Sequence, residues 1–273
     1  MNFAVQSILV DTCNLALLLL AIGLPAYALL RRYLPTASWE RGGNVWTAPF
    51  NAFDLFVVVL FAVAARTLAM AHDGAPPAGG YSAGMIYKGT FMFVLVAAMI
   101  VMLFNVRRVG ITELFGFNRL SLRAMLTWAI GGALAAILTV QAAAWLWQEF
   151  ILSPAWDTAG EQPLVRLLRE SPDMSLRLAI ALSACLIQPI TEEVIFRGYF
   201  YPAVKRHTDG GFAAIASSVV FAVLHMHVPT LGPLFVMGLL LVLAYELSGS
   251  LWIPIAIHAI FNTTTVVFEI LQR

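Results

Sequence analysis

Long apolar stretches constrain this sequence more than any other feature. A helix needs about 20 predominantly apolar residues to cross the hydrocarbon core of a bilayer, and about eight stretches meet or approach that length. Only 11% of the 273 residues are charged, against roughly 25% in soluble domains. The stretches lie near 7–30, 50–71, 87–105, 123–148, 174–203, 211–228, 230–247 and 250–270. This pattern predicts an all-α, polytopic transmembrane helix bundle that forms one integral-membrane domain over residues 1–273.

Composition and charge limit the partners of such a chain. The first letters, M-N-F-A-V-Q-S, contain no Lys or Arg, so the positive region of a cleavable signal peptide is missing and the first helix is expected to remain. The formal net charge is +1, and no basic tract suggests nucleic-acid binding. Cys13 and Cys185 lack CxxC spacing, which is typical of small core residues. We expect the lipid bilayer as a partner and no nucleic acid.

The distribution of arginine among the connecting loops predicts the orientation of the chain. Lys and Arg are retained on the cytoplasmic side of a membrane. The first, third and fifth connections are the basic ones, through Arg31, Arg32, Arg41, Arg107, Arg108, Arg119, Arg123, Lys205 and Arg206. Both termini are therefore expected on the non-cytoplasmic side. Asp54, Arg66 and Glu246 lie near predicted helix ends, where we interpret them as snorkelling to the interface.

Two adjacent carboxylates and an arginine lie well inside an apolar stretch, in the run Q-P-I-T-E-E-V-I-F-R-G that begins at Gln188. A charge near the bilayer centre costs at least ~2.5 to 3.5 kcal/mol, so such residues usually face a bundle interior or a wet cavity and are paired. Glu193 and Arg197 are four apart and are predicted to form an internal ion pair. Glu192 is rotated by about 100° from this pair and points elsewhere. Pro189 is expected to unwind the helix locally.

Two further predicted helices present polar side chains at a comparable depth. The run F-A-V-L-H-M-H ends one of them with His225 and His227, and H-A-I-F-N places His258 and Asn262 four apart on one face of the last. Each histidine alone is more often a hydrogen-bonded core residue than a catalyst. Several polar groups at the depth of Glu192 favour a functional site. His227 lies outside this set and is expected to be structural.

These residue types suit hydrolysis by an activated water. A carboxylate in an apolar surrounding can act as a general base towards a water, and we assign that role to Glu192. His225 can hold the same water or a metal ion, whereas His258 and Asn262 can donate to a developing oxyanion. The HExxH motif does not occur, and no Asp pair suits an aspartyl protease.

The three runs E-E-V-I-F-R, F-A-V-L-H and H-A-I-F-N resemble the EExxxR, FxxxH and HxxxN motifs of the CPBP family of intramembrane proteases. That family includes type II CAAX prenyl endopeptidases and bacterial proteins related to bacteriocin processing and self-immunity. The resemblance covers about 180–265. It implies an eight-helix fold, a membrane-embedded endopeptidase, a glutamate base, a histidine that holds the water or a metal, and a histidine–asparagine pair that binds the oxyanion, with a glutamate–arginine pair orienting the site. The matching positions are Glu192, Glu193, Arg197, His225, His258 and Asn262.

The cofactor stays open at this point. Glu192, His225 and His258 could together supply the three protein ligands of a catalytic zinc. The alternative, which the sequence favours slightly, is metal-free catalysis, because His258 and Asn262 can bind the oxyanion without a cation and the histidines lack HExxH spacing.

The resemblance implies a membrane-anchored peptide or protein substrate, for instance a prenylated CAAX-type one. We expect the protein in a bacterial inner membrane with the active site towards the cytoplasmic side. A rival interpretation is a non-enzymatic partner, such as a self-immunity or scaffold protein, in which the same groups only stabilise the bundle. A transporter is disfavoured because the two halves show no repeat.

Overall fold

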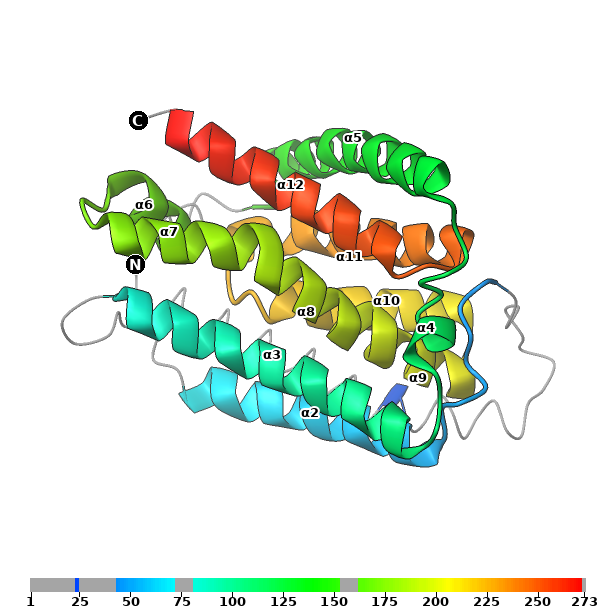
Figure 1. The fold of residues 1–273 in the computed structure, drawn as a ribbon. Helices are drawn as coiled ribbons and strands as arrows, with labels where there is room; N and C mark the ends of the chain where they lie inside the picture. The colour runs from blue at the N-terminus through cyan, green and yellow to red at the C-terminus, as the bar shows by residue number, and fades with distance from the viewer. Residues whose placement is uncertain (1–22, 25–42, 72–80, 153–161, 272–273) are drawn as a thin grey trace.

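The structure is a computed structural model that describes residues 23–24, 43–71, 81–152 and 162–271. Every regular element within these residues is helical, so the predicted all-α bundle is confirmed (Figure 1). The α-helices are α2 (Ala52–Ala71), α3 (Ala83–Val106), α4 (Ile111–Leu114), α5 (Leu122–Leu146), α6 (Pro163–Glu170), α7 (Met174–Leu182), α8 (Gln188–Ile195), α9 (Tyr201–His207), α10 (Gly210–Val223), α11 (Val228–Ser248) and α12 (Trp252–Leu271). Three π-helical segments accompany them, η1 (Trp147–Ile151), η3 (Ser183–Ile187) and η4 (Phe196–Phe200).

Within the described residues, 5 helical stretches are long and apolar enough to cross a membrane. They are α3, α5 with η1, the continuous stretch from α7 to α9, α11 and α12. Helix α10 is apolar but has 14 residues, about 21 Å, which is shorter than a hydrocarbon core of about 30 Å. The expected first span, near 7–30, lies outside the described residues except for Gly23 and Leu24, as do Cys13 and the arginines of the first connection. The chain is an integral, multi-pass membrane protein, but the predicted count of about eight spans is not confirmed.

The helix with the central charges runs without a break over Met174–His207. Its first irregularity is η3, where the N–H of Gln188 donates to the carbonyl of Ser183, five residues back. Pro189 is the next residue, and proline has no N–H to continue the backbone ladder. The disruption expected at Pro189 takes the form of a π turn, which widens the helix just before the ring, and the helix then continues.

The second irregularity, η4, repeats this arrangement about one turn after Glu193, the first member of the predicted ion pair. There the N–H of Tyr201 donates to the carbonyl of Phe196, again five residues back. Pro202 is the next residue, so the backbone again lacks the following donor. In both π turns of this helix, the residue that closes the widened ring is therefore followed directly by a proline.

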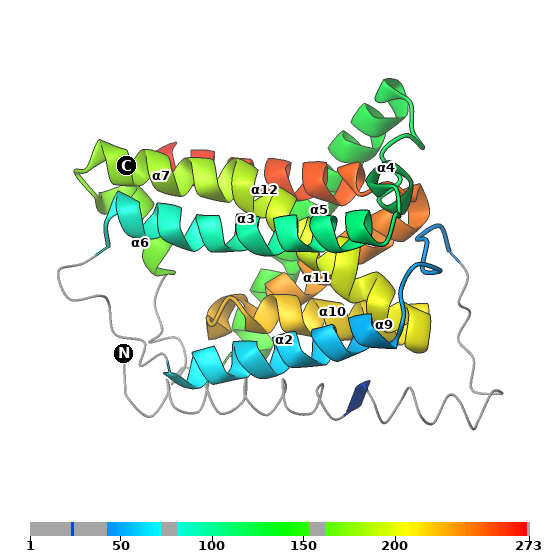
Figure 2. The same cartoon turned by 60° about the horizontal axis from the view of Figure 1, so that its bottom comes forward.

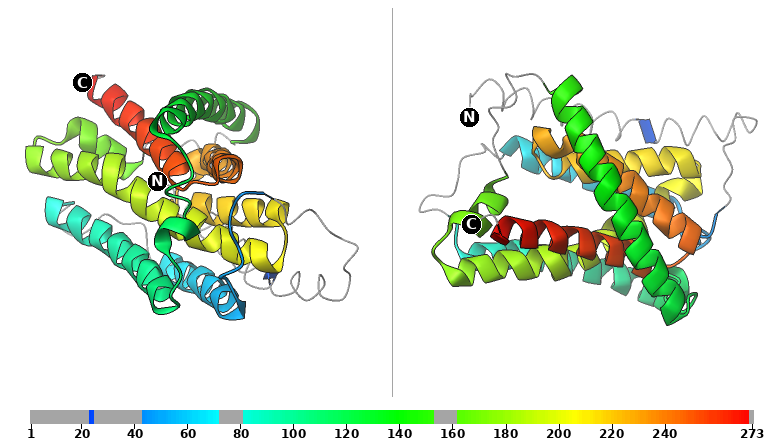
Figure 3. Two further views of the ribbon diagram at one scale, coloured as in Figure 1. Left: turned by 45° about the vertical axis from the view of Figure 1, so that its right-hand side comes forward. Right: turned by 90° about the horizontal axis from the view of Figure 1, so that it is seen from above.

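Helix α8 lies in the middle of the bundle. It packs against α3 on one side and α12 on another, and the following η4 contacts α10 and α11. Helix α5 crosses α11 and α12 (Figure 3), and α2 runs beside α9 (Figure 2). This arrangement gathers the three segments on which the sequence places the site residues.

The turn between α11 and α12 depends on Gly249. This residue has φ 65°, in the left-handed region that glycine adopts at helix C-termini, and its N–H donates to the carbonyl of Tyr245 (2.7 Å). A side chain there would also approach the Arg119 guanidinium. The run S-G-S at 248–250 thus joins α11 and α12 as a helical hairpin, with the two helices in contact.

Asp54 lies in the interior of the bundle and is not exposed at its surface. Its side chain is 0% exposed, and both carboxylate oxygens accept from Nη1 of Arg107 (2.8 and 2.9 Å). The Tyr199 hydroxyl donates to the same carboxylate (3.0 Å). The snorkelling interpretation of Asp54 was wrong, because the tertiary fold supplies a basic partner from the end of α3. The side chain of Arg66 is not among those described.

Glu246 likewise has partners on a neighbouring helix. It forms an ion pair with Lys205, whose side chain is 1% exposed, and it accepts a hydrogen bond from the Tyr201 hydroxyl (2.7 Å). This carboxylate therefore joins α9 to α11 within the bundle, and the snorkelling interpretation does not hold for it either.

Candidate active site

The predicted ion pair between Glu193 and Arg197 is confirmed and fully buried. Both side chains are 0% exposed, and Nη1 of Arg197 donates to Oε1 of Glu193 (3.0 Å). The second terminal nitrogen donates to the carbonyl of Gly238 (3.0 Å), and the guanidinium lies 4.5 Å from the Phe221 ring centroid. The guanidinium of Arg197 therefore contacts Glu193 on α8, Phe221 on α10 and Gly238 on α11.

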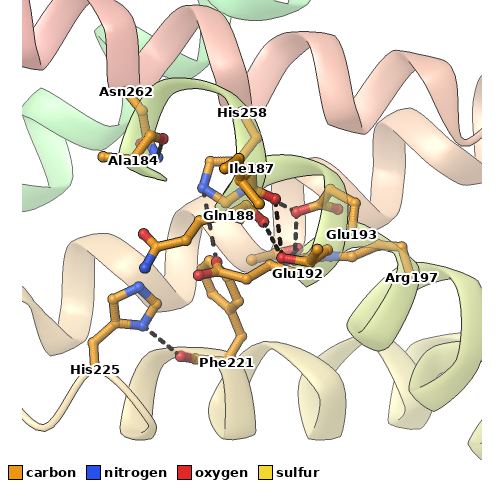
Figure 4. Close-up of polar contacts among 12 residues, drawn as sticks. Ala184, Ile187, Gln188, Glu192, Glu193, Arg197, Phe221, His225, His258 and Asn262 are labelled. Carbon is orange, nitrogen blue, oxygen red and sulfur yellow. Dashed lines mark hydrogen bonds and ion pairs between the residues drawn. The ribbon is translucent and has the colours of Figure 1, made fainter. Parts of the chain in front are cut away.

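His258 extends this network from α12. Its Nδ1 lies 2.9 Å from Oε1 of Glu193, the same oxygen that pairs with the arginine. An ionised carboxylate only accepts hydrogen bonds, so Nδ1 carries a hydrogen and donates it. The other ring nitrogen, Nε2, lies 4.0 Å from Oε2 of Glu192. The histidine therefore lies between the two glutamates, bonded to one and facing the other (Figure 4).

Glu192 differs from its neighbour in having no arginine partner, although Oε2 of each glutamate is buried without a hydrogen-bond partner among the described residues. The residue is 7% exposed, and its buried Oε2 has no hydrogen-bond partner among the residues that the structure describes. Buried polar atoms usually have partners, and an unmet carboxylate oxygen in an apolar bundle is costly. The expected difference between the neighbouring glutamates is present in their partners: Glu193 is held by Arg197 and is 0% exposed, whereas Glu192 is not held by the arginine and keeps a small exposed fraction.

His225 faces the same region from the end of α10. Its Nδ1 lies 2.8 Å from the carbonyl of Phe221, which can only accept, so Nδ1 donates, and in the neutral ring Nε2 carries the lone pair. Met226, at φ 50°, turns the chain sharply after this histidine. The Phe221 ring packs edge-on against both His225 and His258. One aromatic ring thus separates and orients the two imidazoles.

Asn262, one turn beyond His258 on α12, has a backbone partner. Its Nδ2 donates to the carbonyl of Ala184 (2.9 Å), in the π turn η3. The oxyanion role expected of Asn262 stays a prediction. Apart from the proline at position 189, which marks a gap in the backbone ladder, no signal in the sequence indicates this contact.

His227 lies at the start of α11, outside the network around the glutamates. Its Nδ1 lies 3.2 Å from the hydroxyl oxygen of Thr230, which also accepts from Nε2 of Gln162 (3.1 Å). These contacts tie the start of α11 to the residue before α6, in agreement with the structural role expected of this histidine.

A cavity of about 330 Å³ ends at Gln188, one turn before Glu192. It lies between α3, α6 and the α7–α8 stretch, and its lining is mainly apolar, including Tyr81, Met85 and Phe93. Figure 4 shows the Gln188 side chain reaching from α8 towards the side where His225 lies. Gln188 is thus the lining residue of this cavity that lies one helical turn before Glu192.

Four of the six predicted site residues form one continuous network, and two take other backbone partners. The network consists of Glu192, Glu193, Arg197 and His258. His225 and Asn262 flank it, each anchored to a main-chain carbonyl. The sequence analysis missed the Phe221 ring as a packing partner, although this residue opens the run F-A-V-L-H.

The donor geometry does not assemble the zinc site that the sequence left open. In the part of the chain that the structure describes, no three His, Cys, Asp or Glu side chains lie close enough together to hold a metal ion. Glu192 and His258 approach one another, and the bond from Nδ1 of His258 to Glu193 leaves Nε2 available, but no third side chain of these types joins them among the described residues. The residues as placed do not fit a three-ligand zinc centre.

Comparisons with known proteins agree with the motifs. Residues 174–264 match the model of the type II CAAX prenyl endopeptidase Rce1-like family. Over 175 residues, the chain is 26% identical to "Putative membrane peptidase YdiL" of Bacillus subtilis (strain 168), covering 64% of this chain and 69% of that protein. It is 28% identical over 195 residues to "Membrane-embedded CAAX protease MroQ" of Staphylococcus aureus (strain USA300), covering 69% and 75%. No solved structure matches the chain. The resemblance to CAAX-type membrane proteases is confirmed over residues 174–264.

Proposed function

We propose that this membrane peptidase homologue is an intramembrane endopeptidase that hydrolyses a peptide bond of a membrane-associated substrate with a water activated by Glu192. The observation that carries the proposal is the buried Oε2 of Glu192, which has no hydrogen-bond partner among the described residues and faces Nε2 of His258 at 4.0 Å. A buried base next to a buried donor is what general-base hydrolysis requires.

In the proposed reaction, Glu192 takes one proton from a water as the water oxygen attacks the scissile carbonyl. Nε2 of His225 accepts the second O–H of that water and orients it, because Nδ1 is held by the Phe221 carbonyl. The new carbon–oxygen bond places a negative charge on the former carbonyl oxygen. Glu192 then returns its proton to the leaving nitrogen, and the carbon–nitrogen bond breaks.

His258 is the proposed donor to the oxyanion. Its Nδ1–H is bound to the Glu193 carboxylate, and Nε2 faces Glu192; to donate to the oxyanion from Nε2, the ring must carry a second proton in the proposed reaction. Arg197 fixes Glu193 and so fixes the tilt of the imidazole. The pair Glu193–Arg197 therefore orients the donor and does not contact the substrate.

The proposed substrate reaches Glu192 through the membrane interior. The cavity that ends at Gln188 is lined mainly by apolar side chains, which suits a membrane-anchored peptide or protein better than a soluble one. Its anchor can be a prenyl group of CAAX type, as the names of the family and of the Staphylococcus relative suggest. The proposed location is a bacterial inner membrane, with the active site towards the arginine-rich, cytoplasmic side.

Cleavage of a panel of membrane-anchored peptides by purified protein tests the proposal. Wild type is expected to cleave at least one peptide, prenylated or not, and Glu192→Gln is expected to cleave none while its melting temperature stays near that of wild type. A folded wild-type protein without turnover on the whole panel would favour the rival, a non-enzymatic immunity or scaffold protein. Equal cleavage by wild type and Glu192→Gln would refute the proposed role of Glu192 as the general base.

A further inference from the structure

The backbone leaves the carbonyl of Ala184 without a helical donor about two turns before Glu192 and Glu193. In a regular α-helix, the carbonyl of Ala184 would accept from the N–H of Gln188. In η3 that N–H donates to Ser183 instead. The next residue, Pro189, has no N–H at all. Ala184 is half-buried in a membrane-spanning helix, where an unmet carbonyl is costly.

Asn262 supplies the missing donor from another helix. Its Nδ2–H reaches the carbonyl of Ala184 at 2.9 Å, and α12 packs against η3 along this stretch. The side-chain amide thus does for the π turn what a backbone N–H does elsewhere in the helix. It is one of the ways in which broken helices in membranes regain their hydrogen bonds.

The π turn decides which way the glutamates point. A π turn contains one residue more than an α-helical turn. The residues that follow it are therefore rotated about the helix axis by about 100° relative to their positions in a regular α-helix. Glu192 and Glu193 lie within two turns after η3, and their contacts with His258 depend on this rotation. A return to α-helical pairing would turn both carboxylates away from the imidazole.

We propose that Asn262 is a positioning residue that holds η3 open through the Ala184 carbonyl and thereby sets the rotation of Glu192 and Glu193. It acts through the helix and does not contact the substrate. The catalytic consequence rests on the proposed function, whereas the hydrogen bond and its effect on stability do not.

A double-mutant cycle between positions 262 and 189 tests the hydrogen bond from Asn262 to the Ala184 carbonyl without a substrate. Asn262→Ala leaves the carbonyl unmet and is expected to lower the melting temperature in detergent by roughly 2 to 12 °C. Pro189→Ala restores a backbone N–H that can donate to Ala184 in π pairing, or frees the helix to return to α pairing. In the Pro189→Ala background, Asn262→Ala is therefore expected to cost little further stability.

The second π turn provides a matched control. Pro202 follows η4 as Pro189 follows η3, but Asn262 is bonded only to the first turn. Pro202→Ala is expected to leave the effect of Asn262→Ala on the melting temperature unchanged. Equal relief by both proline substitutions would mean a general stabilisation of the helix, and the proposed role of the Asn262–Ala184 bond would be refuted.

Kinetics then separate positioning from direct catalysis. Asn262→Ala is expected to lower kcat more than KM when position 189 is proline, and to change kcat little in the Pro189→Ala background. If Asn262→Ala instead slows cleavage equally in both backgrounds and leaves both melting temperatures unchanged, Asn262 is an oxyanion donor and the proposal is wrong. If no peptide is cleaved by wild type or any variant, the proposed function fails. The melting temperatures of the variants at positions 262 and 189 then decide whether the Asn262–Ala184 bond holds η3 open.

Discussion

Removing either member of the buried Glu193–Arg197 pair should destabilise the protein far more than neutralising the adjacent Glu192. Both members of the pair are 0% exposed, so solvent does not screen their interaction. Breaking a buried pair from one side typically costs about 3 to 5 kcal/mol, because the other charge stays buried without its partner.

The cost of both substitutions is expected at the lower end of this range, because each remaining charge keeps other polar or aromatic contacts. After Glu193→Ala, Arg197 keeps the carbonyl of Gly238 and the ring of Phe221. After Arg197→Ala, Glu193 keeps the Nδ1–H of His258. We therefore expect a loss of about 3 kcal/mol for each, or a fall in melting temperature of about 6 to 12 °C for a protein of this size.

Glu192→Gln serves as the comparison, since its buried Oε2 makes no hydrogen bond among the described residues and the change conserves volume. Its melting temperature is expected to stay within about 2 °C of wild type, equivalent to less than 1 kcal/mol, while cleavage stops. Thermal unfolding in detergent and cleavage of a membrane-anchored peptide are measured on the same preparations. Equal melting losses for Glu192→Gln, Glu193→Ala and Arg197→Ala would refute the division into a catalytic and a structural glutamate.

Four other outcomes follow from the structure. His225→Ala is expected to lower kcat about 100- to 10,000-fold, the usual contribution of a positioned acid–base group, with unchanged melting; a loss confined to KM would make it a binding residue. Asp54→Asn weakens the bonds from Arg107 and is expected to cost about 1.5 to 3 kcal/mol in unfolding experiments, whereas an unchanged melting temperature would contradict its buried role. Exhaustive chelation is expected to leave cleavage unchanged, because the described residues do not converge as three ligands; zinc-dependent recovery of activity would reassign His258 as a ligand. Reporter fusions are expected to place Arg273 on the non-cytoplasmic side, and a cytoplasmic signal would show that one predicted span is missing or extra.

The parts of the site that sequence could predict are those that depend on spacing within one helix. Glu193 and Arg197 are four apart, so their pairing follows from helical geometry alone. The bond from Asn262 to Ala184 joins residues 78 apart and depends on how α12 packs on η3, which no local pattern encodes.

The errors in the sequence analysis have the same origin. Asp54 and Glu246 were interpreted as interfacial because their place near helix ends is visible in the sequence, whereas their basic partners come from other helices. Pro189 signalled an irregular helix, but proline is compatible with a kink, an unwound turn or a π turn, and the neighbouring helix selects among them.

The proline that follows η3 also bears on how relatives of this chain should be recognised. Only Ile190 and Thr191 lie between Pro189 and Glu192, and this interval fixes the distance between the widened turn and the first carboxylate. A homologous sequence could keep every glutamate, histidine and asparagine of the three motifs and still misdirect its carboxylates after a single-residue deletion between the proline and the first glutamate. A search pattern of the form P-x-x-E-E-x-x-x-R would therefore separate active from inactive members better than the charged positions alone.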